Sequence, residues 1–348
     1  MRETRPSPAA PADEPAVVAD SLVKRFGDTE ALRGVSFEIP RATVLGVLGP
    51  NGAGKTTAVR ILTTLLRPDG GRALIDGIDV VAQPRLARAR IGLTGQYAAV
   101  DERLTGFENL LLVGRLFHMT KDDAASRGRE LLERFSLDEA GDRVVKGYSG
   151  GMRRRLDIAM SLIARPSVLF LDEPTTGLDP RSRLEMWDVI DGLVADGTTL
   201  LLTTQYLDEA ERLADDIVVI DKGTVIARGT EEELKQQSGG ARVEVTLSDS
   251  DALDRIRELL DGIVSPNAVE TIDRSTRVVT IPVTTVDHVV PTVVRRLDDA
   301  GIDVLDVAVR QPTLDDVFLQ LTGHGVSDES ADGADDQLPT AETSGARR

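Results

Sequence analysis

One stretch of the chain decides the fold class, namely Gly49-Pro50-Asn51-Gly52-Ala53-Gly54-Lys55-Thr56-Thr57. It fits the pattern G-x-x-x-x-G-K-[ST] and lies between a short apolar run and an amphipathic segment, as that pattern requires. Glycines let successive backbone N–H groups turn inward around phosphate oxygens, and the following helix adds its positive N-terminal end. Lys55 would bring a positive charge to the β- and γ-phosphates of a nucleotide, and Thr56 would offer a hydroxyl to Mg²⁺. The stretch therefore predicts a phosphate-binding loop.

The sequence on both sides of this loop, over residues 18–235, alternates short apolar runs with longer amphipathic segments. Such alternation is typical of an α/β domain whose parallel strands are buried on both faces. We expect strands at residues 42–48, 167–171, 198–204 and 216–220, and helices at residues 55–66, 105–119, 150–164 and 181–195.

Beyond this domain the pattern breaks at residues 236–240, which read Gln-Gln-Ser-Gly-Gly and predict a linker. Strand-like and helix-like segments then resume in residues 241–323 and predict a small α+β domain of ferredoxin-like or ACT-like character. Residues 1–17 and 324–348 are poor in large apolar side chains. We expect a disordered lead and a disordered acidic tail there, because such segments cannot bury enough surface to offset their ordering entropy.

Composition narrows the class of function. The chain has 41 basic and 58 acidic residues and a formal charge of -17, which argues against a nucleic-acid binder. A single phosphate site needs only local positive charge, and residues 41–100 and 143–165 are each net positive. The chain has no cysteine, which excludes disulfides, zinc–thiolate sites and thiol nucleophiles. It also lacks a run of ~18 apolar residues, so the sequence predicts no direct membrane span.

Two acids, Asp172 and Glu173, directly follow the apolar run Val168-Leu169-Phe170-Leu171. Acids at the carboxyl end of a buried parallel strand lie at the ligand edge of the sheet. Asp172 would hold Mg²⁺, directly or through water, and Glu173 would polarise the attacking water as a general base. Together with the phosphate loop, this pair predicts nucleotide hydrolysis.

A third motif, Tyr148-Ser149-Gly150-Gly151-Met152, opens a helix that continues with Arg153, Arg154 and Arg155. A Ser-Gly-Gly turn at a helix N-terminus can bind an anion, whereas the three arginines could simply form a solvated helix face. The order of the motifs over residues 18–235 resembles that of the ATP-binding-cassette ATPases. That family places a phosphate loop, a glutamine loop, a Ser-Gly-Gly signature and an Asp-Glu pair along the chain.

The resemblance implies roles for further residues. Phe26 resembles the aromatic residue that stacks on adenine, with an ordinary core residue as the alternative. Gln96 resembles the glutamine that contacts the γ-phosphate and Mg²⁺ and faces a transmembrane partner, with a surface loop residue as the alternative. Two copies would form a head-to-tail dimer, in which ATP on the phosphate loop of one copy meets Ser149, Gly150 and Gly151 of the other.

The chain departs from the family at one functional position. The run Leu201-Leu202-Thr203-Thr204-Gln205-Tyr206 places Gln205 where the family has its switch histidine. The amide of glutamine can donate to a γ-phosphate oxygen but cannot take up a proton near neutral pH. We expect either that Gln205 keeps the γ-phosphate contact and turnover persists, or that turnover depends strongly on partner subunits.

The C-terminal part narrows the resemblance. The segment from Gln311 to Gly323, which reads Gln-Pro-Thr-Leu-Asp-Asp-Val-Phe-Leu-Gln-Leu-Thr-Gly, resembles the ending of the daunorubicin/doxorubicin-resistance group of ATP-binding subunits. That group also carries the Tyr-Ser-Gly-Gly-Met and Thr-Thr-Gln-Tyr forms. The apolar residues of this ending recur at helical spacing, which predicts a helix over residues 314–321. We expect this helix to cover the sheet of its own domain, with dimer contacts or placement of the domain against the core as its alternative roles.

The resemblance implies an ATP- and Mg²⁺-dependent hydrolysing subunit that powers drug, antibiotic or lipid efflux. It also implies a separate membrane permease, a homodimer of the ATPase and a peripheral location at the cytoplasmic face of the cell membrane. Residues 97–119 would be the surface that docks on the permease, with Thr105 capping a helix that starts near Phe107. Three alternatives remain: an importer ATPase with a C-terminal regulatory domain, an ATPase outside transport, and a nucleotide-dependent switch without turnover.

Overall fold

The computed structural model describes residues 14–95, 99–237, 241–249, 256–259, 271–283 and 288–322. Gln96, most of the expected lead and the expected acidic tail lie outside the described residues. The lead expected to reach residue 17 ends earlier, because Ala16 and Val17 are fully buried and Val17 begins a strand. Within the described ranges, no helix combines the length and the apolar character that crossing a bilayer requires.

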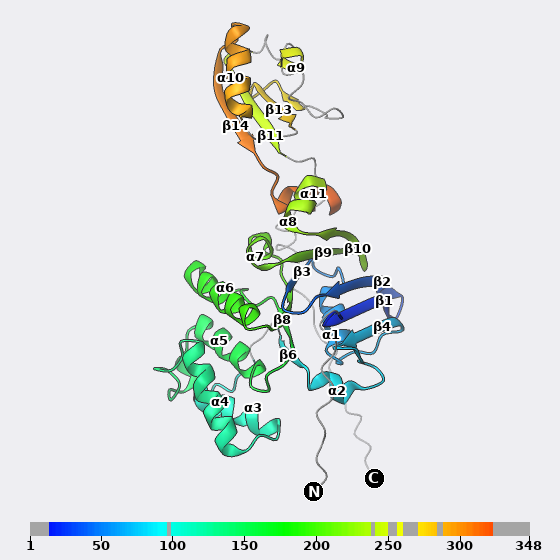
Figure 1. Ribbon diagram of the computed structural model, residues 1–348, viewed down its shortest axis with the longest axis vertical. Helices are drawn as coiled ribbons and strands as arrows, with labels where there is room; N and C mark the ends of the chain where they lie inside the picture. Colours follow the sequence, from blue (N-terminus) through cyan, green and yellow to red (C-terminus); the bar gives the residue numbers. More distant parts are fainter. Residues whose placement is uncertain are drawn as a thin grey trace, which may run out of the picture.

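A six-stranded sheet forms the centre of the larger domain (Figure 1). Its strand order is β10-β9-β3-β8-β7-β6, and every neighbouring pair is parallel except β10 with β9. The strands β3, β7 and β8 are buried along their whole length, as the continuous apolar runs predicted. The bounds are β3 (Val44–Leu48), β6 (Ile91–Thr94), β7 (Val168–Asp172), β8 (Thr199–Thr203), β9 (Asp216–Asp221) and β10 (Thr224–Gly229).

An antiparallel sheet of order β2-β1-β4-β5 lies beside the central sheet. The alternation in the sequence did not predict it. Helix α1 (Lys55–Leu62) follows the phosphate loop and packs into one apolar core with both sheets. The strands are β1 (Val17–Phe26), β2 (Thr29–Ile39), β4 (Gly70–Ile75) and β5 (Ile78–Asp79).

Helices gather on the opposite side of the central sheet and form a second core (Figure 1). Thr105 caps α3 as expected: its hydroxyl accepts from the Glu108 N–H, and the Glu108 carboxylate accepts from the Thr105 N–H. Besides α1, the described helices outside the C-terminal domain are α2 (Pro84–Arg88), α3 (Gly106–Leu116), α4 (Lys121–Arg134), η1 (Val145–Gly147), α5 (Gly150–Ser161), α6 (Pro180–Ala195), α7 (Leu207–Leu213) and α8 (Glu231–Gln237).

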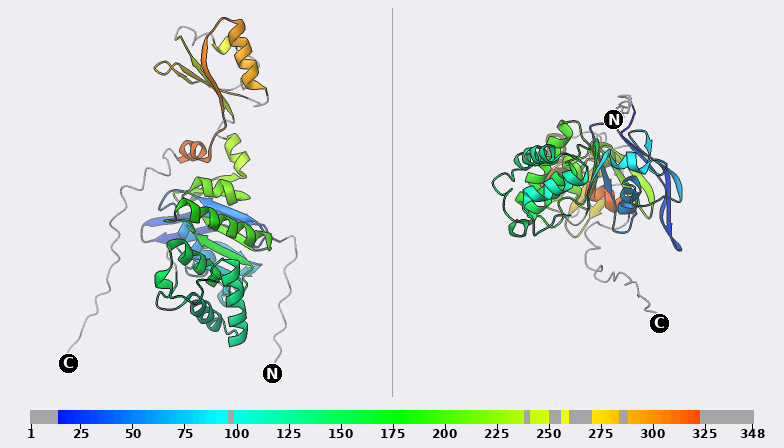
Figure 2. Two further views of the ribbon diagram at one scale, coloured as in Figure 1. Left: turned by 90° about the vertical axis from the view of Figure 1, so that its left-hand side faces the viewer. Right: turned by 90° about the horizontal axis from the view of Figure 1, so that it is seen from below.

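The C-terminal domain stands apart from the larger domain, and α8 and α11 lie between the two (Figure 2). Its sheet has the antiparallel order β12-β13-β11-β14, which is the order of the predicted ferredoxin-like topology. Alternate residues of the sheet pack against α10 in a separate apolar core. The elements are β11 (Arg242–Leu247), α9 (Ile256–Leu259), β12 (Thr271–Asp273), β13 (Val278–Pro282), α10 (Val289–Asp299) and β14 (Val304–Arg310).

The final helix α11 (Leu314–Thr322) corrects the prediction that it covers the sheet of its own domain. Its buried residues Leu314, Val317 and Phe318 pack against α7 and α8 of the larger domain instead. The Leu314 N–H also donates to Glu211 of α7 at 3.2 Å. The helical spacing of the apolar residues was therefore informative about the helix, but their partner surface lies about a hundred residues earlier in the chain.

Candidate nucleotide site

The predicted site residues follow three neighbouring parallel strands of the central sheet. In the order β3-β8-β7, Val47 pairs with Thr203, and Thr203 pairs with Asp172. The phosphate loop leaves β3, Gln205 follows β8, and Glu173 follows β7. Three segments that are far apart in sequence therefore meet at one edge of the sheet, where ligands of α/β folds bind.

The phosphate loop is held tightly by its own chain. Gly54 has φ +113°, and a Cβ there would lie 2.6 Å from the Ala31 carbonyl oxygen. Gly223, in the turn between β9 and β10, donates its N–H to the Ala53 carbonyl at 2.9 Å and accepts from the Arg33 N–H at 2.7 Å. The loop is thus joined to both sheets, so its backbone is fixed before any ligand arrives.

The Lys55 side chain lies folded against the loop. Its Nζ donates to the carbonyls of Gly49 at 2.5 Å and Pro50 at 3.0 Å, and the residue is 6% exposed. The N-cap of α1 is Gly54, whose lack of a side chain leaves the first helical N–H groups available to a ligand, and no acid lies in the first turn. Thr56 is exposed at the start of this helix. The loop therefore offers cationic and N–H groups to an anion.

The two carboxylates differ in environment. Asp172 is buried, and its Oδ1 accepts from the Thr203 hydroxyl. Glu173 is half-buried and has φ +49°, a left-handed conformation that is uncommon outside glycine. Its N–H donates to the Thr203 carbonyl at 3.0 Å, and its Oε2 accepts from the Thr176 hydroxyl at 3.2 Å. The backbone thus turns sharply between a carboxylate held in the sheet and one directed toward the edge.

The residues proposed for Mg²⁺ provide oxygen donors, which suit this ion. Thr56 presents a hydroxyl and Asp172 a carboxylate at the same sheet edge, while Gln96 lies outside the described residues. Within the described part of the chain, no group of three or more His, Asp or Glu side chains could hold a metal alone. This donor set fits an ion that takes further oxygens from a nucleotide and from water.

Phe26 ends β1 as an exposed residue, so the alternative that it belongs to the core is wrong. Its ring is 49% exposed, with the Lys24 Nζ 5.6 Å from the ring centroid. Its strand pairs with β2, which carries Ala31 against the phosphate loop. Phe26 is thus an exposed aromatic residue with a cation over its ring.

The Ser-Gly-Gly turn begins α5. Ser149 is the N-cap, with its hydroxyl accepting from the Met152 N–H at 3.2 Å, and both Ser149 and Gly150 are exposed. Tyr148, by contrast, is buried in the helical core and donates its hydroxyl hydrogen to the Ala140 carbonyl at 2.7 Å. The aromatic substitution in the signature therefore anchors the turn. Ser149 and Gly150 face outward, whereas the third predicted anion-binding residue, Gly151, is buried beside Ser182.

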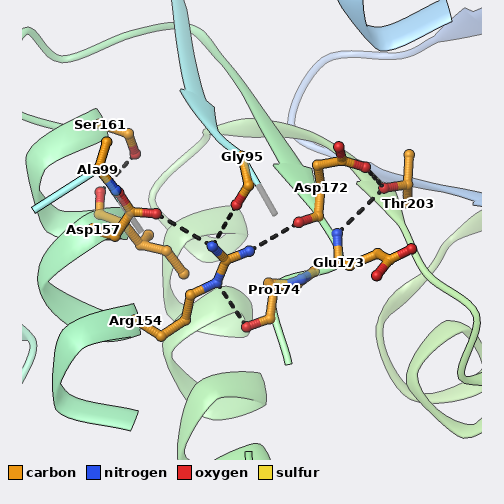
Figure 3. A network of polar contacts seen from close by, with 10 residues as sticks. Gly95, Ala99, Arg154, Asp157, Ser161, Asp172, Glu173, Pro174 and Thr203 are labelled. Carbon is orange, nitrogen blue, oxygen red and sulfur yellow. Dashed lines mark hydrogen bonds and ion pairs between the residues drawn. The ribbon is translucent and has the colours of Figure 1, made fainter. Parts of the chain in front are cut away.

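Arg154 corrects the solvated-face interpretation of the three arginines, because it is 6% exposed. Figure 3 shows its guanidinium between the ends of β6 and β7, donating to the carbonyls of Gly95, Asp172 and Pro174. Burial lowers the pKa of Arg154, and burial also raises the pKa of its ion-pair partner Asp157. An acid between the apolar residues Leu156 and Ile158 is the sequence signal that points to a buried pair.

Glu209 is a second buried charge that the motifs did not indicate. It lies on α7, fully buried, and its Oε1 accepts from the Trp187 indole N–H at 3.3 Å. Burial raises the pKa of Glu209 above its ordinary 4.5, with the Thr204 and Thr175 hydroxyls opposing the change. Thr204 is fully buried directly before Gln205, which is itself half-buried. Glu209 therefore supports the segment that carries the switch position.

Comparisons with known proteins agree with this arrangement. A family model described as ABC transporter matches residues 32–176, and one described as ATP-binding protein DrrA1-3-like, C-terminal domain, matches residues 229–322. The chain is 54% identical over 318 residues to the daunorubicin resistance ATP-binding protein DrrA2 of Streptomyces coeruleorubidus, covering 91% of this chain and 98% of that protein.

Two further similarities are to a second relative of nearly the same length and to a solved structure. Identity is 47% over 327 residues to the daunorubicin/doxorubicin resistance ATP-binding protein DrrA of Streptomyces peucetius, covering 94% of this chain and 98% of that protein. A solved structure of the ATP-binding subunit of an ABC transporter is 27% identical, with a TM-score of 0.58, and the match covers 64% of this chain and 93% of that one.

Proposed function

Because this chain belongs to the daunorubicin/doxorubicin-resistance group of ABC transporter ATP-binding proteins, we propose that it powers efflux of a drug, antibiotic or lipid-like molecule. The chain is an ATPase. The observation that carries the proposal is the shared edge of β3, β8 and β7, which joins a phosphate loop to a carboxylate pair. A separate membrane permease would form the pathway for the cargo.

The residues at this edge divide the work of hydrolysis. The loop from Gly49 to Thr57 binds the phosphates through backbone N–H groups, and Lys55 neutralises negative charge that moves onto the leaving phosphate. Glu173 accepts a proton from the attacking water, and Gln205 donates from its amide to a γ-phosphate oxygen. Phe26 stacks on the adenine. The tight packing around Gly54 supports this assignment, because a rigid loop costs little reorganisation during the reaction.

Mg²⁺ would be held by Thr56, Asp172 and Gln96, and when bound it would stabilise negative charge on the phosphate oxygens. The Thr203 hydroxyl orients the Asp172 carboxylate by donating to Oδ1. The same threonine receives the Glu173 N–H on its carbonyl. One residue of β8 thus sets the relative position of the metal ligand and the general base.

The exposed signature turn supports a head-to-tail dimer. Ser149 and Gly150 face outward, whereas Gly54 of the phosphate loop packs against Ala31 of the same chain. In a dimer, the signature turn of one copy completes the ATP site of the other by adding N–H groups at the positive end of α5. Hydrolysis removes the γ-phosphate that connects the copies, which allows them to separate.

The permease would dock on α3 and the residue that ends it. Leu112, Leu116 and Phe117 are 46%, 69% and 48% exposed, an unusual density of apolar side chains on one short helix. This surface follows closely after Gln96 in the sequence, so docking and the ATP site would communicate over a short path. Binding there would hold the chain at the cytoplasmic face of the membrane.

Transport by inverted membrane vesicles tests the proposed function. Vesicles carrying this chain and its membrane permease should take up doxorubicin when ATP is added, and Glu173→Gln should abolish uptake while leaving ATP binding intact. Leu116→Asp should reduce recovery of the chain with the membranes. Uptake that continues at the wild-type rate in Glu173→Gln vesicles would contradict the assignment of the chain as the motor.

A further inference from the structure

Arg154 and Asp157 hold both ends of the three-residue segment that contains Gln96. On the incoming side, Arg154 Nη1 donates to the Gly95 carbonyl at 2.6 Å. On the outgoing side, the Ala99 N–H donates to Asp157 Oδ1 at 2.9 Å. The two side chains are themselves paired at 3.3 Å, one helical turn apart on α5. Gly95 and Ala99 are therefore both tied to one turn of one helix.

The same guanidinium holds both sides of Glu173. Arg154 Nη2 donates to the Asp172 carbonyl and Nε to the Pro174 carbonyl, each at 2.9 Å. These contacts fix the backbone just before and just after the residue with φ +49° (Figure 3). Carbonyl acceptors at the ends of two parallel strands would otherwise be buried without partners, which is costly. Arg154 thus sets the spacing between Gly95 and the backbone on both sides of Glu173.

The helix that supplies this pair also begins with the signature turn. Arg154 lies five residues after Ser149, which is about 7 Å along the axis of α5. A helix is stiff over that length, so a shift of its first turn also moves Arg154. Burial lowers the pKa of Arg154, and the negative charges of Asp157, Asp172, Glu173 and Glu209 oppose this shift.

We propose that Arg154 and Asp157 form a positioning pair that holds Gly95 and Ala99 in a fixed relation to Glu173 and makes this relation depend on the position of the signature helix. The inference rests on the proposed function, because it assumes that Ser149 meets ATP held by a second copy. Arrival of that ATP would move α5, and the pair would pass the movement to the general base of its own site. Neither residue touches ATP, so both act through Glu173 and Gln96.

Kinetics of Arg154→Lys separate positioning from ATP binding. Lysine keeps the charge, but one ammonium cannot reproduce the planar fork that reaches three carbonyls. With its permease, the variant should lose about 10- to 100-fold in kcat while its Kd for ATP changes less than about 3-fold, as misplacement of catalytic groups predicts. Arg155→Lys is the matched control, because Arg155 pairs only loosely with Glu185 at 3.8 Å, and it should keep kcat within about 2-fold.

Hydrogen exchange tests the same pair without turnover. The Ala99 amide should exchange at least about 10-fold faster in Arg154→Lys and in Asp157→Asn than in wild type or Arg155→Lys, with the amides of α5 still protected. Wild-type kcat in Arg154→Lys, or unchanged exchange at Ala99 in both variants, would overturn the proposal. If the wild type hydrolysed no ATP with its permease, the proposed function would fail, and the exchange rates would still decide whether the pair holds this segment.

Discussion

The phosphate loop and the signature turn are both glycine-rich turns that begin a helix, yet the chain treats them in opposite ways. At the phosphate loop, Gly54 is packed against Ala31 and Lys55 is 6% exposed. At the signature turn, Ser149 and Gly150 are exposed, and a Cβ on Gly150 would meet nothing within 4 Å, although Gly151 is buried against Ser182. The phosphate loop is packed within its own chain, whereas the first residues of the signature turn are exposed to solvent. The difference agrees with the proposal that a complete ATP site needs two copies.

The largest effect should come from a substitution in the phosphate loop. Lys55→Ala removes the cation nearest the phosphates, so ATP affinity and turnover should both fall, with kcat reduced by about 100-fold or more. Equilibrium binding of ATP to the purified chain and phosphate release with the permease measure the two quantities. A Lys55→Ala protein that binds ATP as tightly as wild type would remove the distinction between the two turns.

A substitution at Ser149 in the signature turn should lower turnover without lowering ATP affinity. Ser149→Arg places a large cation at the exposed N-cap, where it would block approach of a second copy and oppose the helix dipole. Turnover should fall at least about 10-fold, while ATP binding to the single chain stays within about 2-fold of wild type. The same binding and phosphate-release assays apply, and a matched loss of ATP affinity would show that Ser149 belongs to the site of its own chain.

A pair of glycine substitutions sharpens the comparison in terms of stability. Gly54→Ala forces a side chain into φ +113° and toward the Ala31 carbonyl, which should lower the free energy of unfolding by about 3 kcal/mol. Gly150→Ala has room, so the free energy of unfolding should change by less than about 0.5 kcal/mol. Urea unfolding of both variants measures the difference, and equal losses would contradict the contrast between a packed and an open turn.

The smallest effect is on the pH dependence of stability and comes from Glu209, which is buried on α7. Its folded-state pKa is raised above the ordinary 4.5, so the folded chain keeps this proton to higher pH than the unfolded chain does. Stability therefore falls as pH rises from about 4.5 through the folded-state pKa, by about 1.4 kcal/mol for each unit of elevation. Glu209→Gln lacks this dependence, so its melting temperature relative to wild type should rise over that range. A difference in melting temperature that stays constant over this pH range would show that the pKa of Glu209 is not raised.

The sequence was most informative where a motif and its consequences are local. The phosphate loop, the strand before it and the helix after it lie within about twenty residues, and the structure has all three as predicted. The antiparallel sheet was missed because its pairing joins distant residues, such as Val17 with Ile75, and its strands are only partly buried. Sequence alone supplies no partner for such a strand.

The remaining errors share that cause. Arg154 resembled its two neighbours in the sequence, and only carbonyls from β6 and β7, more than fifteen residues away on either side, decide that it is buried. The apolar residues of α11 were recognised, but their packing on α7 and α8 depends on how the two domains meet. In both cases the sequence identified the type of side chain, but long-range contacts determine what that side chain packs against.

The central claim is that each chain carries two halves of different ATP sites, and the mass of the Glu173→Gln protein in solution tests it most directly. With ATP and Mg²⁺, light scattering should report a dimer that reverts to a monomer without nucleotide, and adding Ser149→Arg should prevent the dimer. A Glu173→Gln protein that binds ATP and remains a monomer, or a dimer unaffected by Ser149→Arg, would contradict the account.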